Sequence, residues 1–352
     1  MATPPTPAQQ LNQLEKFLEQ DPKNPRLLVK AIDTALAMGD IAAARKHANS
    51  ALEAHPGDPF MRHRHGNVLV AEGKLDDAAV IFSYLWAKYG DANVAYNLGL
   101  VRFRQRKYDA AFKAVTPITP KSLPQAVALA VRALHYQGKV KEARALFETA
   151  PHANDPEVLA VASLVYVDDS DIATAETLAK KSLQGGRREL EALVAAGTAA
   201  LTRKDAKDAQ TYFKEALGIN ANDPRTLAGM GMAHLLAGDA AKSMKFLERA
   251  QAQMPEHPDT LEAMGWAHAM AGEFDKAEEV FKRMLAKGDG DARRGLAVTY
   301  ALKGNVAEAR MTLAHLKQDD DAALVARTIL DRGTKVTKKL GQLAKSRSAK
   351  KR

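Results

Sequence analysis

The chain has 352 residues, 46% of them apolar and 6% aromatic, so it holds enough material for a hydrophobic core. It has no cysteine, which excludes disulfides, thiolate nucleophiles and cysteine-ligated metal sites. The formal net charge of +9 comes from residues 332–352, which hold nine Lys and Arg and no acid. In residues 1–331 the 42 Lys and Arg balance the 42 Asp and Glu. By net charge, this part of the chain is therefore not a surface that binds polyanions.

The N-terminal segment carries no targeting or membrane signal. Residues 1–7 lie in a stretch with neither the basic nor the apolar region of a secretory signal, and we expect them to be disordered. Residues 8–24 predict a lone capping helix that ends near Asp21-Pro22. No stretch reaches the roughly 18 apolar residues of a membrane span. We therefore expect a cytoplasmic protein, unless a leader segment has been removed.

Residues 25–320 repeat one pattern nine times. Position 8 of the pattern is small in most copies, position 15 is usually glycine and position 20 is nearly always alanine. Apolar residues recur at helical spacing on both sides of position 15, so each unit predicts two helices that pack closely and are joined at a glycine. One such pair cannot bury its apolar face alone, but stacked neighbours can. The units begin at Pro25, Pro59, Ala92, Pro124, Pro156, Leu190, Pro224, Pro258 and Gly290.

These units resemble the tetratricopeptide repeat (TPR) family, whose pattern is W-x2-L-G-x2-Y, then A-x3-F, then P. In the unit from Pro258 the pattern is traced by Met264, Gly265, His268, Ala277 and Phe281. The resemblance implies an all-α fold: a right-handed α-solenoid superhelix of antiparallel helix pairs, with a concave groove lined mainly by first helices.

The third unit ends in a proline-rich seam. Residues 116–124 contain three prolines, which disfavour helix at and before themselves, so we expect a short second helix in this unit. The seam is open to two interpretations, a joint that changes the pitch of the superhelix and an irregular loop between units.

The resemblance implies that positions 2, 5, 9, 12 and 13 of the first helices, and position 6 in some members, face the groove. In units two to four the candidate partner-binding residues are polar, aromatic and cationic, which suits the carboxylates and carbonyls of a peptide. They are His63, Arg64, Asn67, Asn93, Tyr96, Asn97, Arg104, Arg132 and Tyr136. In the later units they are apolar and adaptable, namely Met232, Leu236, Trp266 and Met270. The other interpretation of this apolar set is burial against a terminal helix.

Some TPR proteins clamp a C-terminal carboxylate with Lys and Asn on one helix, Asn on the next, and Lys and Arg on the third. Asn67 and Asn97 fall at the matching asparagine positions, but His63 replaces the first lysine. Gln125 and Leu129 replace the last two basic residues. Recognition of a chaperone tail by such a clamp is therefore not expected.

No catalytic or metal-binding motif is present. The sequence has no Gly-rich phosphate loop, HExxH, GxSxG or EF-hand pattern, so we expect no enzyme activity, cofactor or metal. His234 and His268 share position 11 of adjacent units, and we expect them to stack one repeat apart, partly buried. The expected function is a non-catalytic scaffold that binds segments of one or more partner proteins in its groove.

The chain ends with a predicted capping helix over residues 321–331 and a basic tail over residues 332–352. The tail is either simply solvated or binds an anionic partner, nucleic acid or an acidic membrane surface. Its candidate contact residues are Lys338, Lys339, Lys345, Arg347, Lys350, Lys351 and Arg352. A third hypothesis, a subunit of a bacterial secretion or pilus assembly system, rests on family analogy alone. The sequence identifies neither the partner nor the oligomeric state.

Overall fold

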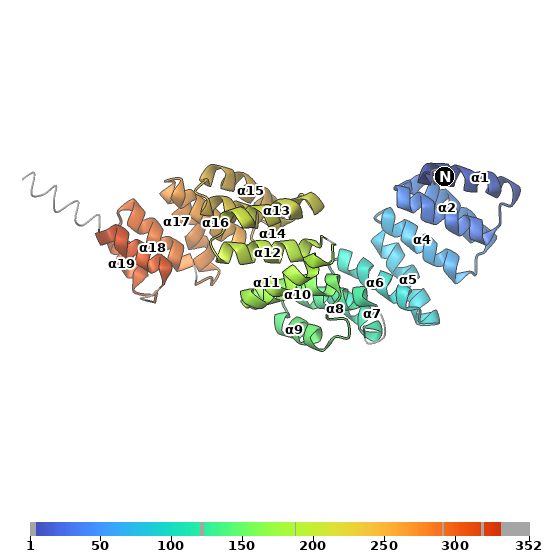
Figure 1. Ribbon diagram of the computed structural model, residues 1–352, viewed down its shortest axis with the longest axis horizontal. Coiled ribbons are helices and arrows are strands. Elements are labelled where there is room, and N and C mark those ends of the chain that lie inside the picture. Colours follow the sequence, from blue (N-terminus) through green and yellow to red (C-terminus); the bar gives the residue numbers. More distant parts are fainter. Residues whose placement is uncertain (1–4, 120–122, 187, 291, 318–319, 332–352) are drawn as a thin grey trace, which may run out of the picture. The chain divides into compact units, whose positions relative to one another are not determined.

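The computed structural model describes residues 5–119, 123–186, 188–290, 292–317 and 320–331, and every regular element in these ranges is helical (Figure 1). The elements are α1 (Pro7–Gln20), α2 (Pro25–Met38), α3 (Ile41–Ala54), α4 (Pro59–Ala71), α5 (Leu75–Tyr89), α6 (Ala92–Arg104), α7 (Tyr108–Val115), the 3-10 helix η1 (Thr116–Ile118), α8 (Pro124–Tyr136), α9 (Val140–Thr149), α10 (Pro156–Asp168), α11 (Ile172–Gln184), α12 (Leu190–Thr202), α13 (Ala206–Ile219), α14 (Pro224–Leu236), α15 (Ala240–Gln253), α16 (Pro258–Met270), α17 (Phe274–Ala286), α18 (Ala292–Lys303) and α19 (Val306–Leu313). Residues 321–331 form one further helix.

Two kinds of residue mark where the first helices begin. Proline occupies the first position of α2, α4, α8, α10, α14 and α16, where its missing N–H costs nothing. An Asp directly before several of these helices accepts hydrogen bonds from the first free N–H groups, as Asp58 does from Phe60 and Met61. Asp91, Asp155 and Asp223 cap α6, α10 and α14 in the same way. We propose that these helix bounds divide residues 25–320 into nine units.

The turn after each first helix has one backbone conformation. The residue at position 15 has a positive φ in all nine units, between 59° and 84°. Six of the nine are glycine, which adopts this left-handed conformation without strain. The other three are Arg106, Ser170 and Lys204, with φ of 59°, 63° and 61°. The turn is therefore kept even where the residue does not favour it.

The small residue at position 8 makes room for the large apolar residue at position 24. A methyl group built on Gly66 would lie 2.6 Å from Phe82, and one built on Gly197 would lie 2.7 Å from Phe213. Both rings have no exposed surface. The sequence pattern paired position 8 with the alanine at position 20. The structure shows instead that the glycine is needed for the ring one turn further along the second helix.

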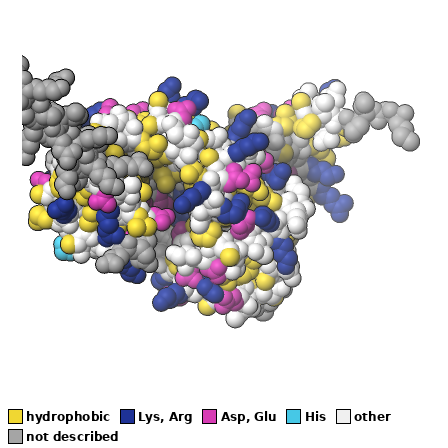
Figure 2. Space-filling model, turned by 60° about the vertical axis from the view of Figure 1, so that its left-hand side comes forward, with side chains coloured by type: hydrophobic (Ala, Val, Ile, Leu, Met, Phe, Trp, Pro, Cys, Tyr) yellow, Lys and Arg dark blue, Asp and Glu magenta, His cyan; other side chains and the backbone are white. Residues whose placement is uncertain are grey.

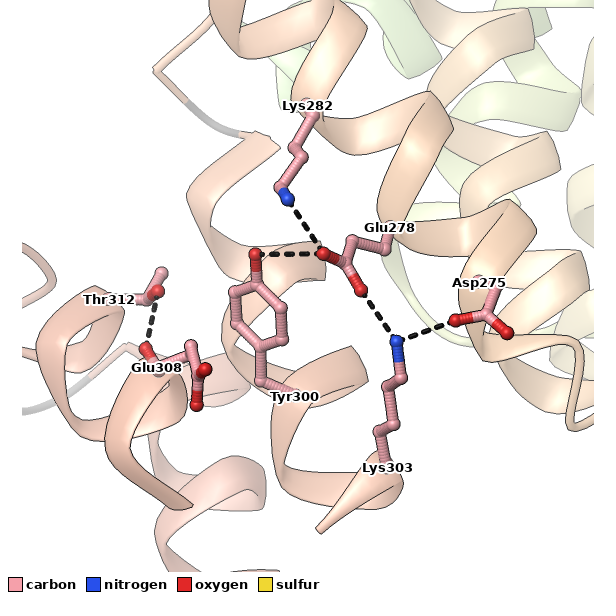
Figure 3. Close-up of polar contacts among 7 residues, drawn as sticks. All are labelled: Asp275, Glu278, Lys282, Tyr300, Lys303, Glu308 and Thr312. Atoms are coloured by element: carbon pink, nitrogen blue, oxygen red, sulfur yellow. Dashed lines mark hydrogen bonds and ion pairs between the residues drawn. The ribbon is translucent and has the colours of Figure 1, made fainter. Parts of the chain in front are cut away.

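Ion pairs join position 21 of one second helix to position 14 of the next first helix. Lys303 Nζ lies 2.9 Å from Glu278 Oε2, and Glu278 also accepts hydrogen bonds from Lys282 and Tyr300 (Figure 3). Arg203 and Glu176 form the same pair at 2.5 Å. The charges are reversed in two other places, where Arg144 pairs with Asp169 at 2.6 Å and Arg45 pairs with Glu72.

The chain divides into an N-terminal half, Met1–Ser170, and a C-terminal half, Asp171–Arg352. In each half the core is a series of local clusters between neighbouring helices, as expected of a repeat stack. In the N-terminal half Leu11 and Leu18 of α1 are buried against α2 and α3. In the C-terminal half Ala323, Ala326 and Leu330 are buried in the cluster that contains Phe281.

The second helix of the third unit is short, as the prolines of the seam predicted. Helix α7 has eight residues and continues into η1. Residues 120–122 and the whole basic tail, 332–352, lie outside the described residues. Among the helices that the structure describes, none is long and apolar enough to cross a membrane.

Candidate functional site: the first-helix faces

In the N-terminal half, polar side chains link the first helices α2 to α4, α4 to α6 and α8 to α10, and we call these contacts the inner-face ladder. Arg64 of α4 donates to Asp33 of α2 at 3.3 Å. The Asn97 amide of α6 donates to His63 Nε2 at 2.9 Å and to Asn67 Oδ1 at 3.3 Å, both on α4. The remaining rungs are Arg132–Glu157 at 3.6 Å and His135–Asp168 at 2.6 Å, between α8 and α10.

The inner-face ladder changes the interpretation of the predicted cationic lining. Arg64 and Arg132 were expected to meet a partner's carboxylates, but each lies beside a carboxylate of the chain itself, Asp33 or Glu157. Their side chains are only 25% and 18% exposed. At the clamp positions, the Asn97 amide holds both Asn67 and His63 in place. These groups set the shape of the face more than they offer charge to a ligand.

Burial also shifts the pKa of two residues on this face, the ladder residue His63 and Tyr96. The pKa of His63 is held below its ordinary value mainly by burial, and next by the charge of Arg64. A neutral imidazole fits its role as acceptor for the Asn97 amide. Burial raises the pKa of the Tyr96 phenol, and the nearby Glu157 carboxylate adds to this effect. Arg64 and Arg132 are therefore paired within the chain, and the pKa shifts of His63 and Tyr96 favour their uncharged forms.

A cavity of about 640 Å³ opens at the edge of the N-terminal face, between the start of α4, the end of α5 and the start of α6. Its lining includes His63, Arg64 and Asn93, three residues that the repeat register predicted. It also includes Phe60, which is at position 2 of the same register and is 67% exposed, and Tyr89, at the end of a second helix. The register could not indicate Tyr89, because second helices were not expected to reach the groove.

Further along the same half, aromatic rings gather at the ends of α6 and α8. Tyr136 is 49% exposed, and its ring centroid lies 5.2 Å from that of Phe103 and 5.3 Å from that of Tyr108. Arg104, beside Phe103, is exposed. The predicted residues Arg104 and Tyr136 thus lie at the same end of their helices, apart from the cavity at the other end.

In the C-terminal half, three exposed apolar side chains occupy position 13 of three successive first helices. Leu236 of α14 is 40% exposed, Met270 of α16 is 51% exposed, and Leu302 of α18 is 41% exposed. Helices α14 and α16 contact each other, as do α16 and α18. We call these three residues the apolar row. The other two predicted residues, Met232 and Trp266, lie one turn earlier on their helices and are partly buried.

Trp266 lines a second cavity, of about 520 Å³, together with Val298 and the helix over residues 321–331. The Trp266 ring packs edge-on against Phe281 at 5.5 Å, and its Nε1 donates to Glu262 at 3.3 Å. Only part of the apolar set therefore lies beside the terminal helix. Val298 and Trp266 lie beside the terminal helix, whereas Leu236 and Met270 face outward.

The paired histidines do not stack on each other. His234 stacks on Phe246 of its own unit with centroids 5.4 Å apart, and burial lowers its pKa. His268 lies 2.6 Å from Glu273, also of its own unit. Among the described residues no group of three or more His, Asp or Glu lies close enough to hold a metal ion.

Charge is dispersed over the described surface. On the face shown in Figure 2, Lys and Arg side chains are interspersed with Asp and Glu. This agrees with the zero formal net charge of the chain outside the tail. The predicted contact residues of the tail, from Lys338 to Arg352, lie outside the described residues.

Comparisons with known proteins agree with the fold. Two profiles described as tetratricopeptide repeat match, one over residues 11–59 and 63–121, and the other over residues 200–266, 234–291 and 268–330. No curated protein matches the sequence.

Similar solved structures include PilF of Pseudomonas aeruginosa, with 17% identity over 59% of this chain and 96% of that one, at a TM-score of 0.48. Yeast Tom70 has 16% identity over 79% of this chain and 62% of that one, at a TM-score of 0.49. The Cut9–Hcn1 tetramer of the APC/C has 13% identity over 93% of both chains, at a TM-score of 0.45. The profile matches and the helix hairpins show that the chain belongs to the tetratricopeptide repeat family.

Proposed function

We propose that the chain is a non-catalytic scaffold that holds segments of partner proteins on its first-helix faces. The family supports a role in protein interaction, and the apolar row supports a particular surface. Leu236, Met270 and Leu302 are each about half exposed, at one repeat position, on adjoining helices. Contiguous exposed apolar residues mark interaction sites more often than chance exposure does.

A partner segment that covers the apolar row gains binding free energy. Burying a Leu or Met side chain completely contributes roughly 1.5–3 kcal/mol, so covering three half-exposed side chains contributes a few kcal/mol. The methionine side chain is flexible and can pack against partners of different shape, which suits a surface that binds more than one segment. Neighbouring helix axes lie about 8–10 Å apart, so the row matches a partner segment with apolar side chains at intervals of roughly that length.

The N-terminal half supports the same function with different chemistry. Phe60, Asn93, Arg104 and Tyr136 are exposed on its first helices, while the inner-face ladder fixes the helices beneath them. Aromatic and amide groups are suited to contacts with peptide side chains and backbone. We propose that this half contributes specificity, and that the apolar row contributes most of the affinity.

The test compares matched substitutions at two exposed apolar sites. The Leu236→Ser and Met270→Ser double variant removes most of the apolar row. Met311→Ser on α19 is the control, because Met311 is 70% exposed but lies on a second helix. Partners captured by the wild-type chain are identified by mass spectrometry, purified and titrated by calorimetry. We expect the double variant to weaken binding at least tenfold and the control to leave it within twofold. Equal binding by all three proteins would overturn the assignment.

The basic tail carries a separate proposal, which rests on charge alone. All of the net charge of +9 belongs to residues 332–352, and a cationic segment gains affinity for nucleic acid by releasing counterions. Deleting these residues should abolish any salt-dependent binding of RNA or DNA by the full chain. Binding that is unchanged by the deletion would rule the tail out as the contact.

A further inference from the structure

Lys204 lies in a turn whose backbone conformation is unfavourable for a lysine. It lies at position 15, where six of the nine units have glycine, and its φ is 61°. A residue with a Cβ is disfavoured in this conformation. Strain of this kind persists where the side chain or its surroundings supply a compensating contact. A contact made by the Lys204 side chain would compensate for the strain.

The Lys204 side chain reaches the terminal helix. Its Nζ lies 3.7 Å from Asp321 Oδ2, although three whole repeat units separate the two residues in sequence. Both side chains are well exposed, at 76% and 88%, so water and salt screen their attraction. The contact is a weak and reversible link between the sixth unit and the helix over residues 321–331.

The cavity of about 520 Å³ beside Trp266 lies next to this link, since Lys204 and Asp321 are both part of its lining. The rest of the lining is apolar: Trp266, Val298, Ala322, Leu324 and Val325. Leu324 and Val325 are 49% and 50% exposed, so this side of the terminal helix presents apolar surface to solvent. The two charges at the cavity face each other, so a charged ligand group would lose hydration without gaining a free counter-charge.

The cavity continues the apolar row by one helical turn. Trp266 and Met270 are four residues apart on α16, and Val298 and Leu302 are four residues apart on α18. Residues at this spacing lie on the same face of a helix, about 6 Å apart. A partner segment that covers Met270 and Leu302 would thus bring its next side chain to the cavity.

We propose that this cavity receives one uncharged aliphatic or aromatic side chain of a partner segment, and that the Lys204–Asp321 pair is a latch at its side. The inference rests on the proposed function for its natural occupant. The apolar lining favours a group of the Leu or Phe type. Closing the latch restricts the exit of that side chain.

The experiment uses Trp266 as an internal reporter. The chain has two tryptophans, Trp86 and Trp266, so Trp86→Phe leaves a single indole at the cavity. The probe is N-phenyl-1-naphthylamine, a neutral apolar fluorophore that quenches nearby tryptophan. We expect saturable quenching of Trp266 emission, and Leu324→Asp in the same background should raise the probe Kd at least tenfold. Met311→Asp is the matched control and should change the Kd by less than twofold.

Two further measurements keep the proposal open to refutation. If Trp86→Phe disturbs folding, fluorine NMR of the unsubstituted chain labelled with 5-fluorotryptophan replaces it, and only the Trp266 resonance should shift with the probe. N-acetyl-leucine amide and N-acetyl-phenylalanine amide should displace the probe. Displacement by laurate alone would overturn the assignment to a side chain, as would quenching that does not saturate or that Leu324→Asp leaves unchanged.

The latch is tested by Lys204→Gly, which removes the ion pair and relieves the backbone strain together. We expect a higher melting temperature and a probe dissociation rate raised at least threefold. An unchanged dissociation rate would contradict the latch. Because this assay needs no partner protein, its failure with partner binding intact would refute only the cavity. Normal probe binding with equal partner affinities for the wild type and the Leu236→Ser/Met270→Ser variant would refute only the proposed function.

Discussion

The ring of Phe281 occupies the space that a side chain on Gly265 would need. A methyl group on that glycine would lie 2.6 Å from Phe281 Cζ, well inside van der Waals contact. Gly295 of the next first helix lies against the same edge of that ring, and a methyl group built on Gly295 would lie 2.2 Å from Phe281 Cζ. One fully buried ring on a second helix therefore fixes how closely two successive first helices approach it.

Gly265→Ala should destabilise the C-terminal half. Phe281 has no exposed surface and no room to retreat, so overpacking of roughly 1–3 kcal/mol is expected. Thermal unfolding followed by circular dichroism measures the effect as a lower melting temperature. Gly218→Ala is the control, because no atom lies within 4 Å of a methyl group there and alanine favours helix. Equal melting temperatures for both variants would contradict the packing described above.

Arg106→Gly should stabilise the N-terminal half. Arg106 has a φ of 59° at a turn where most units have glycine, and relieving this strain is worth about 0.5–1 kcal/mol after the extra freedom of glycine in the unfolded chain is subtracted. Arg106→Ala removes the same charge but keeps the strain, so it should not stabilise the protein. Urea unfolding of the two variants separates these contributions. A gain with alanine as large as with glycine would assign the effect to charge.

Glu278→Gln should lower stability near neutral pH and less so in acid. Hydrogen bonds from Lys282, and next from Lys303, hold the pKa of the Glu278 carboxyl below its ordinary value of 4.5. Its contribution is therefore complete above about pH 4.5 and is lost as the pH falls through the lowered folded pKa. Denaturant titrations from pH 7 to pH 3 should show the difference between wild type and variant shrinking over this interval.

The matched control for that series is Glu308→Gln, an exposed position on α19. It removes the same charge from the same half, so it measures the change that net charge alone produces. A pH dependence that is identical in the two variants would show that the Glu278 contacts do not contribute.

Asn97→Ala should raise the pKa of His63. The Asn97 amide donates to Nε2 and so favours the neutral ring, in addition to the larger effect of burial. NMR titration of the His63 ring protons measures the change directly. Because the folded pKa lies below 6.5, wild-type stability should decline as the pH falls through about 6.5, and the decline should be smaller in the variant. Asn93 lines the same cavity as His63 but makes no hydrogen bond to its ring, so Asn93→Ala should leave the pKa of His63 unchanged.

The sequence predicted the fold because the constraints that define it are local. Gly265 and Phe281 are close in sequence, so their shared requirement recurs at a fixed spacing in most units and is visible as a pattern. The turn at position 15 is visible for the same reason, and the profile matches confirm the family. The Asp residues directly before the first helices could also have indicated where these helices begin. They stand next to the prolines that were used to place the same boundaries, as in α4 and α10.

The candidate site was harder to predict, because exposure depends on neighbouring units. Trp266 and Met270 are one turn apart on α16 and both read as groove positions, but only Met270 is well exposed. Arg64 read as a free cation because Asp33, its partner, belongs to the preceding unit. Lys204 and Asp321 are separated by three units, and the only hint of their contact is a lysine where a glycine is usual.

The reversed ion pairs at positions 14 and 21 have a consequence for how such an array can change by recombination. Arg144 faces an acid on the fifth unit, whereas the fifth unit's own Glu176 faces Arg203 on the sixth. Excising the fifth unit in frame would set Arg144 against Arg203, two cations at a junction built for opposite charges. The copies are therefore alike in shape without being interchangeable in order, so a deletion or duplication in this chain is tolerated only where the polarity on either side still matches.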